Sequence, residues 1–278
     1  MSNRFNRDYE LAISLKKEDI LITPPFRIQF EATKNIKRSL NKATIKIYNL
    51  SKEKYNELRK DENEKKYLRC ALSVGYDKLG IVFQGNIKTC SVRREGTDVI
   101  TTIECVDGGY DFQNSFTSKT VRSKEEIIDA TIKDMKNTKK GKITKQKKIL
   151  RPKVLVGSSA KIIEKSLQED EDYFIDGEKL YILKSNEVIS KFVAEVSSET
   201  GLLTTPSIQE KKITFDTLMN PLLRCAGMCS LESIYEPKMN GTYKIEAITY
   251  NGDNYGDDWS QSVECKIIKN PKVVWWKI

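Results

Sequence analysis

The sequence has 278 residues, with 48 Lys and Arg, 39 Asp and Glu, and no histidine, so its formal net charge is +9. The missing histidine excludes a Ser-His-Asp triad, an imidazole general base and a histidine metal ligand, which argues against many classes of enzyme. This length predicts about two domains whose cores are large enough to fold without disulfides or a metal ion.

Residues 1–116 are predicted to form a first β-barrel domain. Alternating apolar and polar residues, rich in β-branched types, predict strands at 27–33, 43–49, 70–76, 80–95 and 98–107. The last two are expected to pair as a hairpin that turns near Gly96. One short amphipathic helix is predicted over 51–60, with Ser51 as its N-cap.

Residues 117–189 are predicted to form a small α/β insert. Helices are expected at 123–137, where Ser123 and Glu126 have the spacing of a capping box, and at 158–170. A hairpin is expected over 173–183, with Asp176 and Gly177 as its turn.

A Lys-rich segment, residues 133–153, holds ten basic residues and one acidic residue, and so carries the whole net charge of the chain. It contains no aromatic side chain on which nucleic-acid bases could stack. The preferred interpretation is a solvated linker and helix end, or a surface that docks another protein; a nucleic-acid patch is the alternative. We expect it to face outward or toward another protein. The candidate interface residues are Lys139, Lys140, Lys147 and Lys148.

Residues 190–278 are predicted to form a second β-barrel domain. Strands are expected at 200–209, 211–219, 228–237, 241–252 and 259–268. The sequence ECVD at 104–107 returns as ECKI at 264–267, as a duplicated pair of barrels would leave behind. The chain then runs into an apolar tail. Trp275 and Trp276 of this tail are candidate interface residues, expected to pack on their own or a neighbouring chain.

Metal, cofactor and catalytic sites are not expected. The six cysteines mostly lie in strand-like apolar runs, which is typical of buried core thiols rather than of zinc ligands or disulfides. The turn-like run at 251–258 holds several oxygen ligands that could take a calcium ion, although the same residues suit a hairpin turn. No signal peptide or membrane span is predicted, so the cytoplasm is the expected site of synthesis.

Two stretches of the first half and three of the second resemble the baseplate hub proteins of contractile phage tails and phage-tail-like bacteriocins. The first are residues 26–58, with the run IYNLS before a short helix, and 80–109, with a C-x-D-G turn. The second are residues 200–206, 213–223 and 240–265. Their order and spacing carry the resemblance across nearly the whole chain.

The resemblance implies an α+β, mostly β protein in which two small antiparallel barrels flank the insert. It implies a homotrimer that acts as a symmetry adaptor between a hexameric tail tube, or tube initiator, and a trimeric central spike, with wedge proteins as further candidate partners. No enzymatic activity, membrane or specific nucleic acid is expected. The protein would assemble in the bacterial cytoplasm and end in the baseplate of a virion or tail-like particle. The alternative is a basic β-barrel protein that binds nucleic acid.

Overall fold

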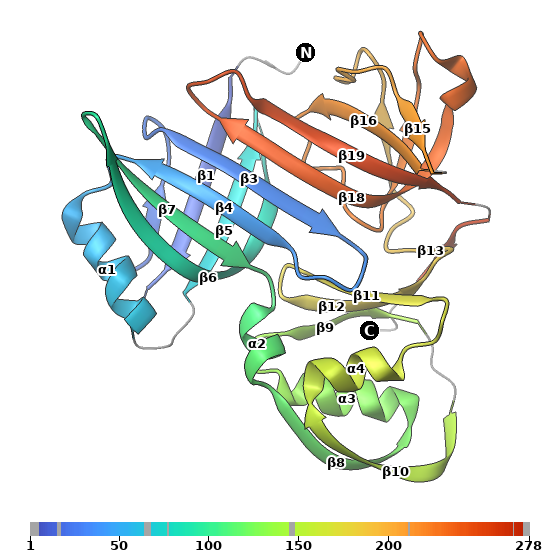
Figure 1. Cartoon of the computed structure of the whole chain (residues 1–278). Helices are drawn as coiled ribbons and strands as arrows, with labels where there is room; N and C mark the ends of the chain where they lie inside the picture. The colour runs from blue at the N-terminus through green and yellow to red at the C-terminus, as the bar shows by residue number, and fades with distance from the viewer. Residues whose placement is uncertain are drawn as a thin grey trace.

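The computed structural model describes residues 6–15, 18–63, 68–76, 78–144, 148–210, 212–268 and 270–274. Within them the fold is α+β and mostly β, as the sequence predicts (Figure 1). One large sheet has thirteen strands, and three smaller sheets have two or three strands each. Figure 1 shows the insert, with its helices α2, α3 and α4, below the large sheet.

The elements follow the chain in three groups. The first half comprises β1 (Asp8–Ser14), β2 (Ile20–Ile22), β3 (Ile28–Asn35), β4 (Lys42–Tyr48), α1 (Lys52–Asn63), β5 (Arg69–Gly75), β6 (Leu79–Glu95) and β7 (Asp98–Val106). The insert comprises α2 (Gly109–Asn114), β8 (Phe116–Ser123), α3 (Lys124–Asp134), β9 (Lys139–Ile143), β10 (Lys148–Ser158), α4 (Ser159–Ser166), β11 (Glu171–Asp176) and β12 (Lys179–Lys184). The second half comprises β13 (Glu187–Val188), β14 (Val193–Val196), β15 (Ser207–Gln209), β16 (Lys212–Leu218), β17 (Met228–Leu231), η1 (Pro237–Met239), β18 (Gly241–Asp253), β19 (Trp259–Ile267) and β20 (Lys272–Val273).

The large sheet runs in the order β15-β16-β19-β18-β3-β4-β7-β6-β5-β1-β2, with β17 and β14 attached beside β18. Strand β3 of the first half pairs antiparallel with β18 of the second, so one sheet crosses both halves. No described sheet closes on itself, so the predicted pair of barrels is not confirmed. The pairing of β3 with β18, here called the internal joint, was not predicted, because pairing between strands far apart in the chain leaves no local sequence pattern.

Alternation along the strands separates a buried face from a polar face. In β4, Ala43, Ile45 and Ile47 are buried, while the lysines and the threonine between them are exposed. Burying such a side chain contributes about 1.5–3 kcal/mol, so this alternation fixes which face of the sheet carries the core. The buried faces of both halves belong to one continuous apolar cluster.

The hairpins β6–β7 and β18–β19 share a register, which extends the short repeat noted in the sequence. Glu104 lies opposite Thr89 in the first hairpin, and Glu264 lies opposite Ala247 in the second. The ladder shifts at the same point in each, between Ile87 and Thr89 and between Ile245 and Ala247. Since bulges are specific structural features, their equal placement supports a common plan for the two halves.

The insert confirms one predicted helix start and corrects one turn. Ser123 caps α3, because its Oγ accepts a hydrogen bond from the Glu126 amide at 3.1 Å. The β11–β12 hairpin turns at Gly177 and Glu178, both with positive φ, and Asp176 is the last residue of β11. The turn is therefore one residue later than predicted, because Asp176 pairs with Lys179 and both central residues are left-handed.

The Lys-rich segment is not the solvated linker that the sequence predicts. It contains β9, which pairs parallel with β12, and the start of β10, which pairs antiparallel with β8. Lysine is depleted in strands, so the many lysines of this segment argued against strands, and β9 and β10 were not predicted. Strand pairing with β8 and β12 outweighs that weak local preference.

Candidate functional site: assembly surfaces of the sheet and the insert

The polar face of the large sheet is a broad surface shared by both halves. A continuous cross-strand row on this face passes from Glu104 to Thr44, Glu31, Asn251 and Ser260. All five side chains are polar and exposed or half-buried. The row crosses the β3–β18 joint without interruption, so the two halves present one surface.

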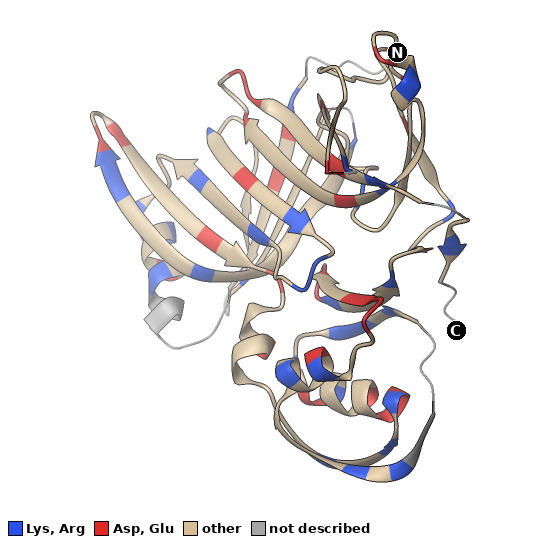
Figure 2. Ribbon diagram, turned by 45° about the vertical axis from the view of Figure 1, so that its right-hand side comes forward, with Lys and Arg blue, Asp and Glu red and all other residues tan. Residues whose placement is uncertain are grey.

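Both signs of charge are spread over this face (Figure 2). Lys42 and Lys46 of β4 lie among Glu31 and Glu104 of the neighbouring strands, and Ser262 donates a hydrogen bond to Asp216 at 2.5 Å. Interspersed charges and hydroxyls keep a surface hydrated and disfavour tight packing against an apolar partner. Such a face suits contact with water better than a protein interface.

The two ends of the eight-strand run β15-β16-β19-β18-β3-β4-β7-β6 present strand edges. Residues Ser91–Glu95 of β6 pair with β7 on one side, and no described strand pairs with their other side. Strand β15 pairs only with β16 among the described strands. Val92 and Ile208, one at each end, are 38% and 55% exposed. Exposed edges with apolar side chains favour pairing with another chain.

The insert is fastened to the large sheet through the C-x-D-G turn after β7. The buried carboxylate of Asp107 accepts hydrogen bonds from the amides of Gly177, at 2.7 Å, and Glu178, at 3.0 Å. Beside it, the side chain of Asn41 donates to the carbonyl of Ile175 at 2.7 Å. A carboxylate suits this place because each of its oxygens can accept one of the two turn amides.

Charged groups surround this junction. Lys34 forms an ion pair of 2.5 Å with Asp176, and Arg69 forms one of 3.1 Å with Glu178. Burial raises the pKa of Asp107 to about 7, and the charge of Asp176 adds to the rise, against the opposing effect of the two turn amides. The junction therefore holds a carboxyl group that titrates near neutral pH.

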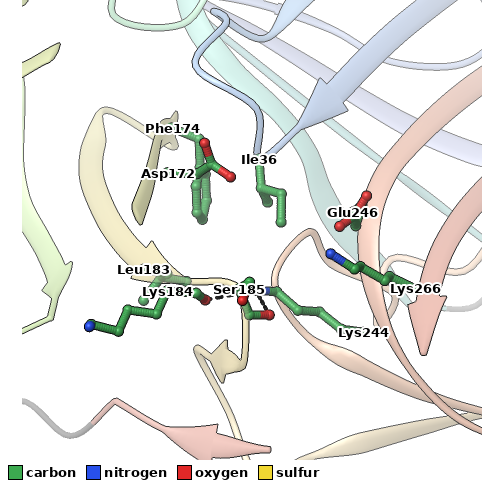
Figure 3. A pocket seen from close by; sticks show the side chains of 9 residues that line it. All are labelled: Ile36, Asp172, Phe174, Leu183, Lys184, Ser185, Lys244, Glu246 and Lys266. Carbon is green, nitrogen blue, oxygen red and sulfur yellow. Dashed lines mark hydrogen bonds between the residues drawn. The ribbon is translucent and has the colours of Figure 1, made fainter. Parts of the chain in front are cut away.

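A second junction lies between the insert hairpin and β18, around a cavity of about 40 Å³ (Figure 3). Lys244 reaches across it and donates hydrogen bonds to the carbonyls of Lys184, at 3.3 Å, and Ser185, at 3.2 Å. Only 2% of Lys244 is exposed, and burial lowers its pKa to about 8. Figure 3 shows Glu246 and Lys266 on the sheet side of the cavity and Asp172 on the insert side.

The structure places the three sequence-predicted interface residues that it describes on two different strands. Lys139 is exposed at the start of β9, whereas Lys140 forms an ion pair of 2.6 Å with Asp129 of α3. Lys148 begins β10 in a different sheet, opposite Ser123. Lys147, Trp275 and Trp276 lie outside the described residues. The junction residues Asp107 and Lys244 were missed, although Asp107 stands in the C-x-D-G turn noted in the sequence.

The run at 251–258 forms the turn between β18 and β19, as its Asn, Gly and Asp residues predict. Asp253 forms an ion pair of 2.7 Å with Arg27 and accepts a hydrogen bond from Gln29 at 2.7 Å. Burial alone would raise the pKa of Asp253, but these contacts and the Tyr255 amide lower it to about 2. Asp253 therefore binds Arg27 and ties the turn to β3.

The cysteines behave as core residues for the most part. Cys70, Cys105, Cys225, Cys229 and Cys265 are buried, and Cys90 is half-buried. Burial raises the pKa of Cys225 to about 12, which keeps that thiol protonated. In the part of the chain that the structure describes, no cluster of three or more Cys, Asp or Glu side chains could hold a metal ion. No described helix is long and apolar enough to cross a membrane.

Several solved structures share this fold at low sequence identity. The 43 kDa tail protein of prophage MuSo2 from Shewanella oneidensis superposes with a TM-score of 0.64 and 7% identity, over 92% of this chain and 96% of that chain. A tail protein from Neisseria meningitidis MC58 gives 0.56 and 8%, over 93% and 96%. The E. coli c3393 protein, a component of the type VI secretion system, gives 0.60 and 9%, over 92% and 77%.

No curated protein sequence matches this chain significantly. A family model, described as baseplate hub gp41, matches residues 9–265. That match spans both halves of the large sheet and the insert between them. The chain therefore belongs to the baseplate hub gp41 family, the structural hubs of contractile phage-tail baseplates.

Proposed function

We propose that three copies of this chain form a ring in which each copy contributes two equivalent units, so that the ring is threefold in sequence and nearly sixfold in shape. Such a ring acts without catalysis as an adaptor between a sixfold tail tube and a threefold spike. One observation carries the proposal. The edges that β3 and β18 pair in the internal joint have equivalents in β15 and β6, at the two ends of the same run of strands, and no described strand pairs with those edges.

The equivalence follows from the shared register of the two hairpins. Counted from the matched bulges, Ser91–Glu95 of β6 correspond to the β18 residues that pair with β3. Strand β15 pairs with β16, which pairs with β19, just as β3 pairs with β4, which pairs with β7. Strand β15 therefore corresponds to β3. The units β15-β16-β19-β18 and β3-β4-β7-β6 therefore follow one another head to tail. A head-to-tail joint repeated between copies generates a ring when the rotation closes.

The proposed joint between copies pairs β6 of one copy with β15 of the next. In the internal joint, Tyr250 lies opposite Ala32, and both are buried. Their counterparts are Val92 and Ile208, the exposed apolar side chains at the two ends. Pairing would cover both and satisfy the open strand edges, as the internal joint already does.

In such a ring the polar face of the sheet would line the central channel, where mixed charges and hydroxyls keep water in contact with the wall. The insert, which Figure 1 shows beyond one end of the strands, would then lie toward a neighbouring tail component. The similar fold of a protein in a PdpA-VgrG complex supports a spike as that kind of neighbour. We propose the spike and the tube, or its initiator, as partners, with wedge proteins as further ones.

Cysteine crosslinking tests the joint directly. In a Cys90→Ser background, we expect the pair Val92→Cys and Ile208→Cys to form a disulfide between copies, because opposed residues on antiparallel strands lie about 4.5–5.5 Å apart, within disulfide range. The product should be covalent dimers and trimers under denaturing conditions. The matched control replaces Ile208→Cys by Gln209→Cys, whose side chain points to the other face. Equal crosslinking of both pairs, or of neither, would refute the joint.

A further inference from the structure

A groove of about 390 Å³ lies where the insert meets the second half of the chain. Its walls come from Tyr181 of β12, from Ile189 and Phe192 after β13, from Leu222 in the loop before β17, and from Met228 at the start of β17. Phe192 is 55% exposed and Leu222 is 61% exposed. Large apolar side chains gathered in one hollow are typical of a surface that another apolar group covers.

The end of the described chain points toward this groove. Strand β20 pairs parallel with β13, with Val273 beside Val188, and the Val274 amide donates to the Val188 carbonyl at 3.1 Å. Parallel strands run in the same direction, so the described chain ends beside the start of the segment that begins at Ile189. That segment is one wall of the groove.

The residues that follow suit the hollow chemically. Val274 packs against the main apolar cluster, as do Ile189 and Tyr181 of the groove. Trp275 and Trp276 come next in the sequence, outside the described residues.

We propose that the Trp275-Trp276 segment of the same chain fills this groove, with indole ring against Phe192 and Leu222. Arg224 lies exposed at the rim, where its guanidinium can stack on an indole ring. Because the groove has walls in both the insert and the second half, the docked segment fastens one to the other. This proposal concerns a single chain and does not depend on the ring.

Fluorescence of a Trp259→Phe variant tests the docking. The chain has three tryptophans, and Trp259 is 3% exposed in the core, so this variant leaves only Trp275 and Trp276 to emit. We expect blue-shifted emission and weak quenching by acrylamide. Adding Leu222→Lys in the groove should shift the emission to the red and at least double the quenching constant. The matched control, Ile234→Lys, changes an apolar residue that is 71% exposed outside the groove and should leave both values unchanged.

Fluorine NMR of the chain labelled with 5-fluorotryptophan keeps Trp259 in place and does not require the Phe variant to fold. Leu222→Lys should move the Trp275 and Trp276 signals to solvent-exposed positions and leave the Trp259 signal unchanged. Solvent-exposed signals in the unsubstituted chain, or signals indifferent to Leu222→Lys, would overturn the proposal. Protection that disappears on dilution would also overturn it, because the occupant would then be a second copy.

Discussion

The contact between Gly108 and Ile175 offers a quantitative test of how the insert is held on the sheet. Gly108 has a φ of 69°, and a Cβ atom there would lie 2.4 Å from Cδ1 of Ile175. The Gly108→Ala variant should therefore lose about 1–2 kcal/mol from its left-handed backbone and about 1–3 kcal/mol from overpacking. We expect its free energy of unfolding in urea to fall by about 2–5 kcal/mol.

Two further variants separate these contributions. Gly96 also has a positive φ, of 58°, but nothing lies within 4 Å of the Cβ position. The Gly96→Ala variant should therefore lose only the backbone contribution. Ile175→Val removes the Cδ1 atom that causes the overlap, so the double variant Gly108→Ala/Ile175→Val should be more stable than additivity predicts, by about 1–3 kcal/mol. Equal losses for the two glycine variants, or strict additivity in the cycle, would refute the packing argument.

Three predictions concern buried or paired charges. Asp107, with a folded pKa of about 7, binds its proton more tightly when folded, so stability should fall as pH rises from about 4 to 7. Asp107→Asn should reduce that slope in urea titrations and leave the part that comes from the raised pKa of Glu178; an unchanged slope would contradict the assignment. Lys244, with a folded pKa of about 8, binds its proton more weakly when folded, so stability should rise by about 3 kcal/mol between pH 8 and 10.5. The Lys244→Met variant should lack this rise, and a rise that persists in it would contradict the assignment. Asp253, with a folded pKa of about 2, contributes stability that is present above pH 4 and lost as the pH falls toward 2. Asp253→Asn should therefore be less acid-sensitive by calorimetry, and unchanged acid sensitivity would show that the Arg27 pair contributes little.

Local pattern predicted much of the large sheet. The alternation of Ala43, Ile45 and Ile47 with polar residues identifies β4, and Ser123 identifies the start of α3. Charge misled the prediction for the Lys-rich segment, where lysines at strand positions look like a linker. Strands β9 and β10 form because β12 and β8 supply hydrogen-bond partners, which the local sequence does not reveal.

The candidate surfaces were less predictable, because they depend on residues far apart in the chain. The repeat ECVD and ECKI hinted at two related halves, but the β3–β18 joint and the matched bulges appear only in three dimensions. Asp107 was visible within a turn motif, yet its partners Gly177 and Glu178 lie about seventy residues away. Nothing in the local sequence indicated that Lys244 is buried at a junction, since a lysine in a strand is expected to be exposed.

The most direct test of the ring is the mass of the purified chain in solution as a function of concentration. Native mass spectrometry and light scattering should show a trimer that dissociates on dilution without populating larger open chains. Ile208→Asp, which places a charge at the proposed joint, should shift the equilibrium toward monomer, while Ile234→Asp on an unrelated exposed surface should not. A chain that remains monomeric at the highest attainable concentration, or a trimer indifferent to Ile208→Asp, would contradict the account.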